Sequence, residues 1–453
     1  MSVIQASANC HWLGPHLLTY SGANANDVVF RPQQGQMLVA NGPQGRFFSM
    51  CQTSRRQGEN HPPTMTTRTR LLGRQLRSRS LSTATEAHES LLRFDMITGT
   101  WVVYSSGRSN RPHQTDATPT KIRLDELPRI VKDCPFCAGN ESMTPPAKMS
   151  IDGLRVVNNK YPAVAPLKLG EKHEHKMPNL INDGILTNNQ VPAVGFHEVV
   201  IESPFHNEHI ATSADTIMAR DLLRAFRDRG LEHRAYADIE HTVFFKNHGT
   251  TAGASLVHPH SQIVSTPVVP VEAERLQSLA WKYFKTHRWS LYERIVAEEM
   301  ALHESQQGHS RIVDVTENFV AMVPFASPGP YVINIIPRFQ ASGLEEQGGL
   351  DSSDFTTLSD DLLDECASVL QRSLRRLHIL LEPDFNLVVQ TAPVPNRGVQ
   401  AAVQSSTFFR WHIRITPRLG AGAMAGFELG SGFFSNAHMP EEDAERLRDV
   451  CLQ

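Results

Sequence analysis

The 453-residue sequence predicts an α/β (α+β) fold made of two repeated halves behind an irregular N-terminal extension. Strand-like apolar runs alternate with amphipathic helical segments from about Arg93 onward. The order strand–helix–strand–strand occurs twice, which indicates an internal duplication. Residues 1–90 lack this pattern. We therefore expect a disordered or targeting-like extension over residues 1–90, one half over 91–270 and a second half over 271–453.

The individual elements follow from hydrophobic period and length. In the first half we expect strands at 101–106, 154–159, 194–204 and 241–247, and a helix over 216–237. A helix-rich bridge covers 272–304. The second half repeats the order with strands at 318–326 and 330–338, a helix over 361–381, and strands at 385–393 and 408–417. Aligning "STP" at 265–267 with "ITP" at 415–417 places His260 opposite Arg410, so the second half is expected to have lost the imidazoles.

The N-terminal extension has its own composition. Residues 1–64 show no convincing hydrophobic period. From Met65 the chain is rich in arginine and has no acidic residue before Glu86, while Leu72 and Leu76 lie one helical turn apart. This composition is typical of a transit peptide starting at Met65, and also of a basic, disordered linker. A cytoplasmic protein and one targeted to a mitochondrion or plastid therefore both stay open.

Overall composition argues against two classes of partner. The formal net charge is −3 and the pI about 6.7, so the chain has no overall positive charge that would attract nucleic acid. No apolar run has the length that a membrane span needs. Of the six cysteines only Cys134 and Cys137 are close in sequence, which favours a reducing compartment over a disulfide framework.

The stretch "DCPFCAGNE" holds those two cysteines in a CxxC spacing. A redox pair normally has its first thiol at a helix N-terminus. Here a glycine and a double proline follow, which disfavours a helix and favours zinc. His206, in "ESPFHNEH", and His258 complete a Cys2His2 set, with His209 as the competitor of His206.

The stretch "LVHPHSQ" (256–262) concentrates the polar groups. In an extended chain His258, His260 and Gln262 would share one face, and Pro259 would put that strand at an edge or leave it locally open. Zinc bound to His258 would orient His260, whose neutral imidazole could then attack phosphorus. Gln262 could donate a hydrogen bond to a phosphoryl oxygen.

Two further patterns suggest phosphate contacts. "NHGTTAGAS" contains Gly249 and Gly253 followed by Ser255, and glycine-rich turns let backbone N–H groups approach a phosphate. "GRSNRP" places Arg108 and Arg111 three residues apart, as a diphosphate clamp requires. A plain turn and solvated surface arginines are the alternatives.

Together these stretches resemble the galactose-1-phosphate uridylyltransferase family, a branch of the histidine-triad superfamily. The resemblance runs from about Arg93 to Leu447 and includes the tail "GFELGSGFF". It implies two duplicated histidine-triad-like halves, each an antiparallel sheet with helices, in an enzyme that is usually a homodimer.

The resemblance also implies roles for single residues. His260 would be the nucleophile that forms a nucleotidyl-histidine, and the zinc ligands would be Cys134, Cys137, His206 and His258. Substrate contacts would come from Arg108, Arg111, Asn159, Asn247, Gly253, Ser255 and Gln262.

The second half departs from the bacterial uridylyltransferase pattern. Leu276, Gln340 and Arg414 stand where ligands of a second metal belong, and only His412 remains, so that site should be empty. Glu428 is found where the hexose-binding lysine and glutamine are expected. The tail is more similar to the ADP-glucose phosphorylase branch.

We expect a nucleotidyltransferase that acts on a nucleotide sugar with a sugar 1-phosphate or phosphate as acceptor. UDP-glucose–hexose-1-phosphate uridylyl transfer is the main hypothesis and ADP-glucose phosphorolysis the alternative. A nucleotide-sugar hydrolase and a non-catalytic, zinc-stabilised binding module are further alternatives.

Overall fold

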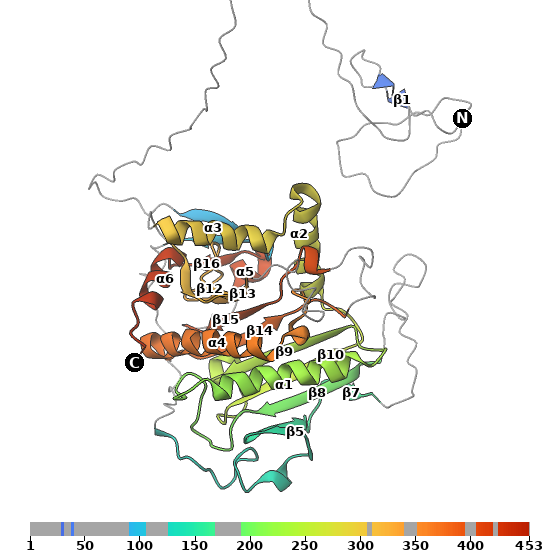
Figure 1. The fold of residues 1–453 in the computed structure, drawn as a ribbon, viewed down its shortest axis with the longest axis vertical. Helices are drawn as coiled ribbons and strands as arrows, with labels where there is room; N and C mark the ends of the chain where they lie inside the picture. Colours follow the sequence, from blue (N-terminus) through green and yellow to red (C-terminus); the bar gives the residue numbers. More distant parts are fainter. Residues whose placement is uncertain are drawn as a thin grey trace, which may run out of the picture. The chain divides into compact units, whose positions relative to one another are not determined.

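The computed structural model describes nine stretches of the chain (Figure 1). They are residues 29–30, 38–39, 90–105, 126–167, 192–305, 310–338, 351–394, 405–419 and 425–452. The chain divides into two compact units, Met1–Ser82 and Thr83–Gln453. In the first unit the described residues form one antiparallel pair, β1 (Val29–Phe30) with β2 (Leu38–Val39).

The second unit is built on one large sheet, whose strands differ in length. Its strands in chain order are β5 (Ala147–Ile151), β6 (Leu154–Asn158), β7 (Ala165–Pro166), β8 (Val194–Ile201), β9 (His241–His248), β10 (His260–Thr266), β11 (Ile312–Val315), β12 (Phe319–Met322), β13 (Ile333–Pro337), β14 (Phe385–Gln390) and β15 (His412–Pro417). In space the order is β11-β12-β13-β15-β14-β9-β10-β8-β6-β5, with β7 alongside β8. All neighbours in this order are antiparallel, which confirms the expected mixed fold with antiparallel sheet.

A smaller sheet and the helices complete the unit. The smaller sheet has the order β16-β4-β3, from β3 (Leu91–Asp95), β4 (Thr100–Tyr104) and β16 (Phe434–Asn436). The helices are α1 (Ile217–Arg234), α2 (Val271–His287), α3 (Leu291–Ser305), α4 (Asp360–Leu381), α5 (Gly426–Ser431) and α6 (Pro440–Arg448). Short 3-10 turns lie at Glu141–Met143, Thr250–Ala252, Phe355–Thr357 and Ser405–Thr407. No helix among the described residues combines the length and apolarity needed to cross a bilayer.

The core lies between the large sheet and the paired helices α1 and α4 (Figure 1). Phe244 and Ile263 from the sheet pack there with Phe226 of α1 and Leu370 of α4, and all four are fully buried. Alternate residues of a strand point to opposite faces, so the residues next to these in sequence point away from the helices. In the second half, α2 and α3 pack on part of that other face. In the first half, part of it holds the polar residues of the site.

The duplication is visible in the topology. The order β8-α1-β9-β10 of the first half recurs as β13-α4-β14-β15, and the halves join where β9 pairs with β14. His260 opens β10 with its Nδ1 2.8 Å from the carbonyl oxygen of His258. His412 opens β15 with its Nδ1 3.2 Å from the carbonyl oxygen of Arg410.

His412, and not Arg410, is therefore the counterpart of His260, and the second half has kept this imidazole. The register expected from the sequence is off by two residues. It was anchored on the prolines at the strand ends, but Pro267 lies 7 residues after His260, just beyond the end of β10, whereas Pro417 lies 5 residues after His412 and is the last residue of β15.

Candidate active site and metal centre

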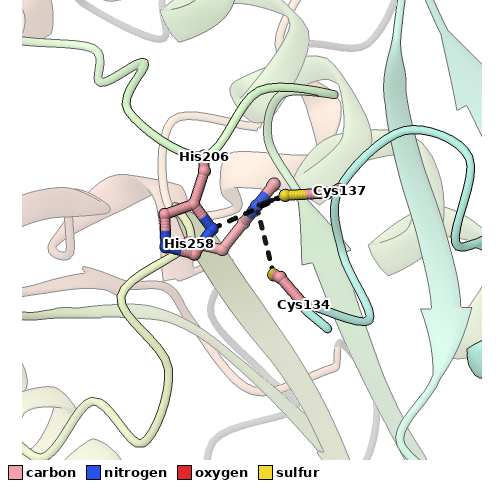
Figure 2. A group of neighbouring side chains, drawn as sticks. All are labelled: Cys134, Cys137, His206 and His258. Carbon is pink, nitrogen blue, oxygen red and sulfur yellow. Dashed lines mark hydrogen bonds between the residues drawn. The ribbon is translucent and has the colours of Figure 1, made fainter. Parts of the chain in front are cut away.

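Two thiols and two imidazoles meet at one point of the first half. The ligand atoms of Cys134, Cys137, His206 and His258 all lie within 4.8 Å of one another. Figure 2 shows both rings turned toward the thiols. Cys137 Sγ lies 3.6 Å from the Nδ1 atoms of His206 and His258, and Cys134 Sγ lies 3.6 Å from Nδ1 of His258. The structure thus brings together all four residues that the sequence nominated.

The donor set fits a tetrahedral zinc ion. Bonds of about 2.3 Å to sulfur and about 2.0 Å to nitrogen at tetrahedral angles separate the two ligand atoms by about 3.5 Å. The observed sulfur–nitrogen distances of 3.6 Å agree closely with this separation. Burial lowers the pKa of both His206 and His258, the latter to about 4, so both rings are neutral as metal ligands must be. Burial raises the pKa of Cys137, so its thiolate requires a nearby cation.

Backbone contacts shape the loop that carries the cysteines. The Asn140 side chain donates to the carbonyl oxygens of Cys134 and Lys132, at 2.8 and 2.9 Å. The backbone N–H of Ala138 donates to the carbonyl of Pro204, just beyond β8. Neither thiol lies at the N-terminus of an α-helix, because turns surround them and only a 3-10 turn follows. The arrangement that lowers a redox cysteine's pKa is therefore missing at this loop.

His258 connects this cluster to His260. Its Nε2 lies 2.8 Å from the carbonyl oxygen of Ser203, so Nε2 carries the proton and Nδ1 is free to bind a metal. Phe136, from the cysteine loop, packs edge-on against the rings of both His258 and His260, at centroid distances of 5.8 and 5.4 Å. Fixing the loop therefore also fixes the position of the His260 ring.

His260 has the tautomer that a nucleophile needs. Its Nδ1 donates to the carbonyl oxygen of His258 at 2.8 Å, which leaves the lone pair on Nε2. Burial lowers the pKa of His260, so the ring is neutral at neutral pH. A neutral imidazole nitrogen with a fixed lone pair can attack an electrophilic phosphorus.

For the strand around Pro259 the sequence left an edge position and a local opening, and the edge position is wrong. The strand begins at His260, so His258 precedes it, while only His260 and Gln262 share its face. It also lies between β9 and β8, in the middle of the sheet. Pro259 is tolerated there because it comes before the first ladder residue, where its carbonyl accepts from the N–H of Glu202 at 3.2 Å.

The glycine-rich loop follows the C-terminal end of β9. Gly249 has φ +82°, and a Cβ there would lie 1.9 Å from Oδ1 of Asp384, so no other residue fits. That carboxylate accepts from the N–H and the hydroxyl of Thr251, at 2.8 and 2.6 Å. Gly253 has φ +88°, and a Cβ there would lie 3.9 Å from Nδ2 of Asn247. Asp384, from the second half, therefore fixes the conformation of this loop, and Asn247 of β9 lies next to its Gly253.

The remaining nominated residues are distributed as follows. Gln262 and Asn159 approach each other through His197, whose Nε2 lies 2.8 Å from Gln262 Oε1 and 3.0 Å from Asn159 Nδ2. Ser255 is exposed beyond the loop. Glu428 lies in α5, and within the described part of the chain no contact joins it to His260. Arg108, Arg111 and Gln340 lie outside the described residues.

The competitor of His206 has another role. His209 is fully buried, its ring lies 4.3 Å from that of His248, and its Nδ1 accepts from the N–H of Ala211. It takes no part in the Cys2His2 cluster.

Behind His260, on the helix-covered face, lies a buried ion pair that the sequence did not reveal. Lys246 Nζ donates to Glu202 at 2.7 Å and to the carbonyl of His260 at 3.3 Å. Ser261 donates to the same carboxylate oxygen at 2.5 Å. Both charged residues are almost fully buried, at 1% and 4% exposure. The signal was present, since a lysine and a glutamate each interrupt an apolar strand, but only the strand register brings them together.

Lys246→Met is expected to lower the free energy of unfolding by about 3–5 kcal/mol, because Glu202 would remain buried without its partner. Urea unfolding followed by fluorescence measures this change. In the double variant Lys246→Met/Glu202→Leu most of the loss should be recovered, since no uncompensated charge is left. A loss below about 1 kcal/mol for Lys246→Met would show that the pair is not sealed from water.

The comparisons with known proteins agree with this geometry. Residues 80–270 match the family model described as galactose-1-phosphate uridyl transferase, N-terminal domain. An ADP-glucose phosphorylase of Arabidopsis thaliana is 28% identical over 368 residues, covering 80% of this chain and 93% of that protein. A galactose-1-phosphate uridylyltransferase of Thermotoga maritima is 25% identical over 366 residues, covering 80% and 99%. Over residues 80–270 the chain thus matches the N-terminal domain of the galactose-1-phosphate uridylyltransferase family, and it is similar to both relatives over 80% of its length. It is a nucleotidyltransferase, as these relatives are.

A solved structure of this family has the same fold. The crystal structure of an ADP-glucose phosphorylase from Arabidopsis thaliana with bound ADP-glucose aligns with a TM-score of 0.62 and 27% identity. The alignment covers 80% of this chain and 100% of that one. The family's N-terminal domain model ends at residue 270, so it includes the Cys2His2 cluster, His260 and the glycine-rich loop.

Proposed function

We propose that the protein transfers a nucleotidyl group from a nucleotide sugar to a phosphate-bearing acceptor through a covalent bond to His260. The observation that carries this proposal is the fixed tautomer of His260, with its lone pair on Nε2, next to a cluster able to bind metal. Nε2 attacks the α-phosphorus, and the bond to the bridging oxygen breaks. Sugar 1-phosphate leaves with the electron pair. An oxygen of the acceptor phosphate then attacks the same phosphorus, and the phosphorus–nitrogen bond breaks with its electron pair returning to Nε2, which restores the free imidazole.

Zinc is the ion that we propose for the Cys2His2 cluster. With all four positions taken by protein atoms, it would supply a rigid cross-link between the cysteine loop and the residue before β10. The chain itself performs the remaining tasks. The His258 carbonyl holds the proton of His260 Nδ1, and the amides of Gln262 and Asn247 are assigned to the phosphoryl oxygens. The homodimer that the resemblance implies remains a prediction.

For the substrate we propose ADP-glucose, with inorganic phosphate as the acceptor. The plant ADP-glucose phosphorylase matches this chain at 28% identity and the bacterial uridylyltransferase at 25%. Leu276, where a second metal ligand was expected, is 2% exposed in an apolar cluster. Uridylyl transfer from UDP-glucose to a hexose 1-phosphate is the second candidate, favoured by the match to uridylyltransferases over 99% of the Thermotoga enzyme.

A substrate panel separates these candidates. With ADP-glucose and phosphate we expect glucose 1-phosphate and ADP, at a rate at least about 10-fold above that with UDP-glucose and galactose 1-phosphate, a ratio within reach of pocket discrimination. The opposite preference would favour the uridylyltransferase. Nucleoside monophosphate released without any acceptor would indicate a hydrolase. Binding of nucleotide sugar without exchange would indicate a binding module.

A further inference from the structure

His197, in the middle of β8, has its protonation state dictated by the backbone. The N–H of Ala163 lies 2.9 Å from Nδ1 of His197. A backbone N–H can only donate, so Nδ1 must accept and the ring proton must sit on Nε2. His197 therefore presents a donor at Nε2.

That donor determines which way the Gln262 amide faces. Nε2 of His197 lies 2.8 Å from the amide oxygen of Gln262. Because Nε2 carries a proton, it binds the oxygen, and the amide NH2 of Gln262 must point in the other direction. The Asn159 oxygen is not available to this proton, since it accepts from the N–H of Tyr161 at 2.9 Å. The Asn159 NH2 nitrogen, 3.0 Å from Nε2, can only donate, so it forms no hydrogen bond with the protonated Nε2.

The amide of Asn247, in the first half, is oriented in a similar way by Asn386 of the second half. The Asn386 NH2 donates to the carbonyl oxygen of Ala252 at 2.8 Å, while its oxygen accepts from Arg418 at 2.5 Å. A carbonyl can only accept and a guanidinium can only donate, so the orientation of Asn386 is fixed. Its NH2 also binds Oδ1 of Asn247 at 2.8 Å, which turns the NH2 of Asn247 away from Asn386.

Both oriented amides flank His260 on one face of the sheet. Gln262 lies two residues after His260 on the same strand, and it pairs with Phe245 of β9. The pairing ends there, and two residues further along each strand the same register leads to Asn247 of β9 and His260 of β10, on the same face. His197 pairs with Val264, so it shares the face of Gln262, and Asn386 pairs with Asn247. All five side chains project from the face that α1 and α4 leave free.

We propose that His197 and Asn386 are positioning residues that turn the NH2 groups of Gln262 and Asn247 toward the transferring phosphoryl group. Each captures an amide oxygen, so that two donors and no acceptor face the negative charge of the phosphoryl oxygens. An amide turned the other way would present an oxygen and repel them. This proposal rests on the proposed function, because that function assigns both amides to the phosphoryl group.

Two replacements of His197 provide a matched test. His197→Asn keeps an acceptor near the Ala163 N–H but lacks the donor toward Gln262, whereas His197→Gln keeps an NH2 near the position of Nε2. We expect the single-turnover release of glucose 1-phosphate, from ADP-glucose or UDP-glucose, to slow about 10-fold in His197→Asn. In His197→Gln it should stay within about 3-fold of wild type. Equal losses in both variants would overturn the proposal, because they would indicate a merely structural histidine.

A double-mutant cycle separates positioning from folding. Gln262→Ala should slow release about 100-fold, as the loss of one transition-state donor does. Adding His197→Asn to Gln262→Ala should slow it no further, because there is no amide left to orient. A further 10-fold loss would show that His197 acts independently of Gln262 and would overturn the proposal.

Asn386 is tested in the same way. Asn386→Asp is isosteric but replaces the donating NH2 with a carboxylate oxygen, so the amide of Asn247 should turn its NH2 toward Asp instead of the substrate. We expect a loss of about 10-fold in release that disappears in an Asn247→Ala background. A loss that persists there would contradict the role given to Asn386.

The tautomer of His197 is also measurable without substrate. In ¹⁵N-histidine-labelled protein, we expect one neutral ring protonated at Nε2 that is missing from the spectrum of His197→Asn. Protonation at Nδ1 would overturn the proposal and leave nucleotidyl transfer untouched. If the wild type shows the expected tautomer but releases no glucose 1-phosphate from either nucleotide sugar, the proposed function fails while the orientation of Gln262 stands.

Discussion

His260→Asn is expected to abolish the covalent intermediate and to lower turnover by about 10⁴-fold or more, as removal of a catalytic nucleophile does. Asparagine can still donate to the carbonyl of His258 from its amide, in place of Nδ1. It has nothing in place of Nε2. The variant therefore keeps the local hydrogen bond and loses only the atom that attacks phosphorus. Steady-state turnover, together with the burst of glucose 1-phosphate, measures both effects.

The second half of the chain offers a control for this variant. His412 makes the same Nδ1 contact to the carbonyl two residues before it, but its ring is completely buried against Tyr292. No substrate can reach its Nε2. His412→Asn should therefore retain the burst even where it costs some stability. A burst that survives in His260→Asn, or disappears in His412→Asn, would place the nucleophile elsewhere.

Cys137→Ser is expected to lower the free energy of unfolding by more than about 3 kcal/mol and to release the bound metal, since the binding free energy of a structural zinc contributes to folding. Cys137 is fully buried and its sulfur lies close to both ligand histidines. The N–H of Val131 also donates to this sulfur at 3.3 Å. Elemental analysis of purified protein and urea unfolding measure the two effects.

Cys366 provides the control, because it is equally buried but lies in α4, outside the cluster. Cys366→Ala should keep the metal content of the wild type. Treating the wild type with a strong chelator should reproduce the instability of Cys137→Ser. The metal assignment fails if the purified wild type carries no metal and chelation leaves its unfolding curve unchanged.

The sequence predicted the chemistry of the site better than its geometry. The CxxC spacing and the histidines of two short polar stretches nominated Cys134, Cys137, His206 and His258 as one cluster, with His209 left as the competitor of His206. Local patterns carry such information, because ligand type and spacing are properties of short segments. They do not carry strand order. Pro259 indicated an edge strand or a local opening, and β10 can be central because the proline precedes the ladder.

Contacts between strands account for what the sequence missed. His197 is one polar residue within an apolar strand, and its meaning appears only when β8 is paired with β10. Lys246 and Glu202 meet in the same way, across β9 and the end of β8. Asn386 lies in the half that was expected to be degenerate. Its contact with Asn247 depends on the pairing of β9 with β14, which joins the two halves.

Mass spectrometry of the intact protein, mixed with ADP-glucose or UDP-glucose in the absence of acceptor, tests the central claim most directly. We predict one nucleotidyl group per chain, mapped by peptide analysis to His260 and discharged when phosphate or a hexose 1-phosphate is added. An adduct on another residue, or turnover without any adduct, would contradict a covalent role for His260.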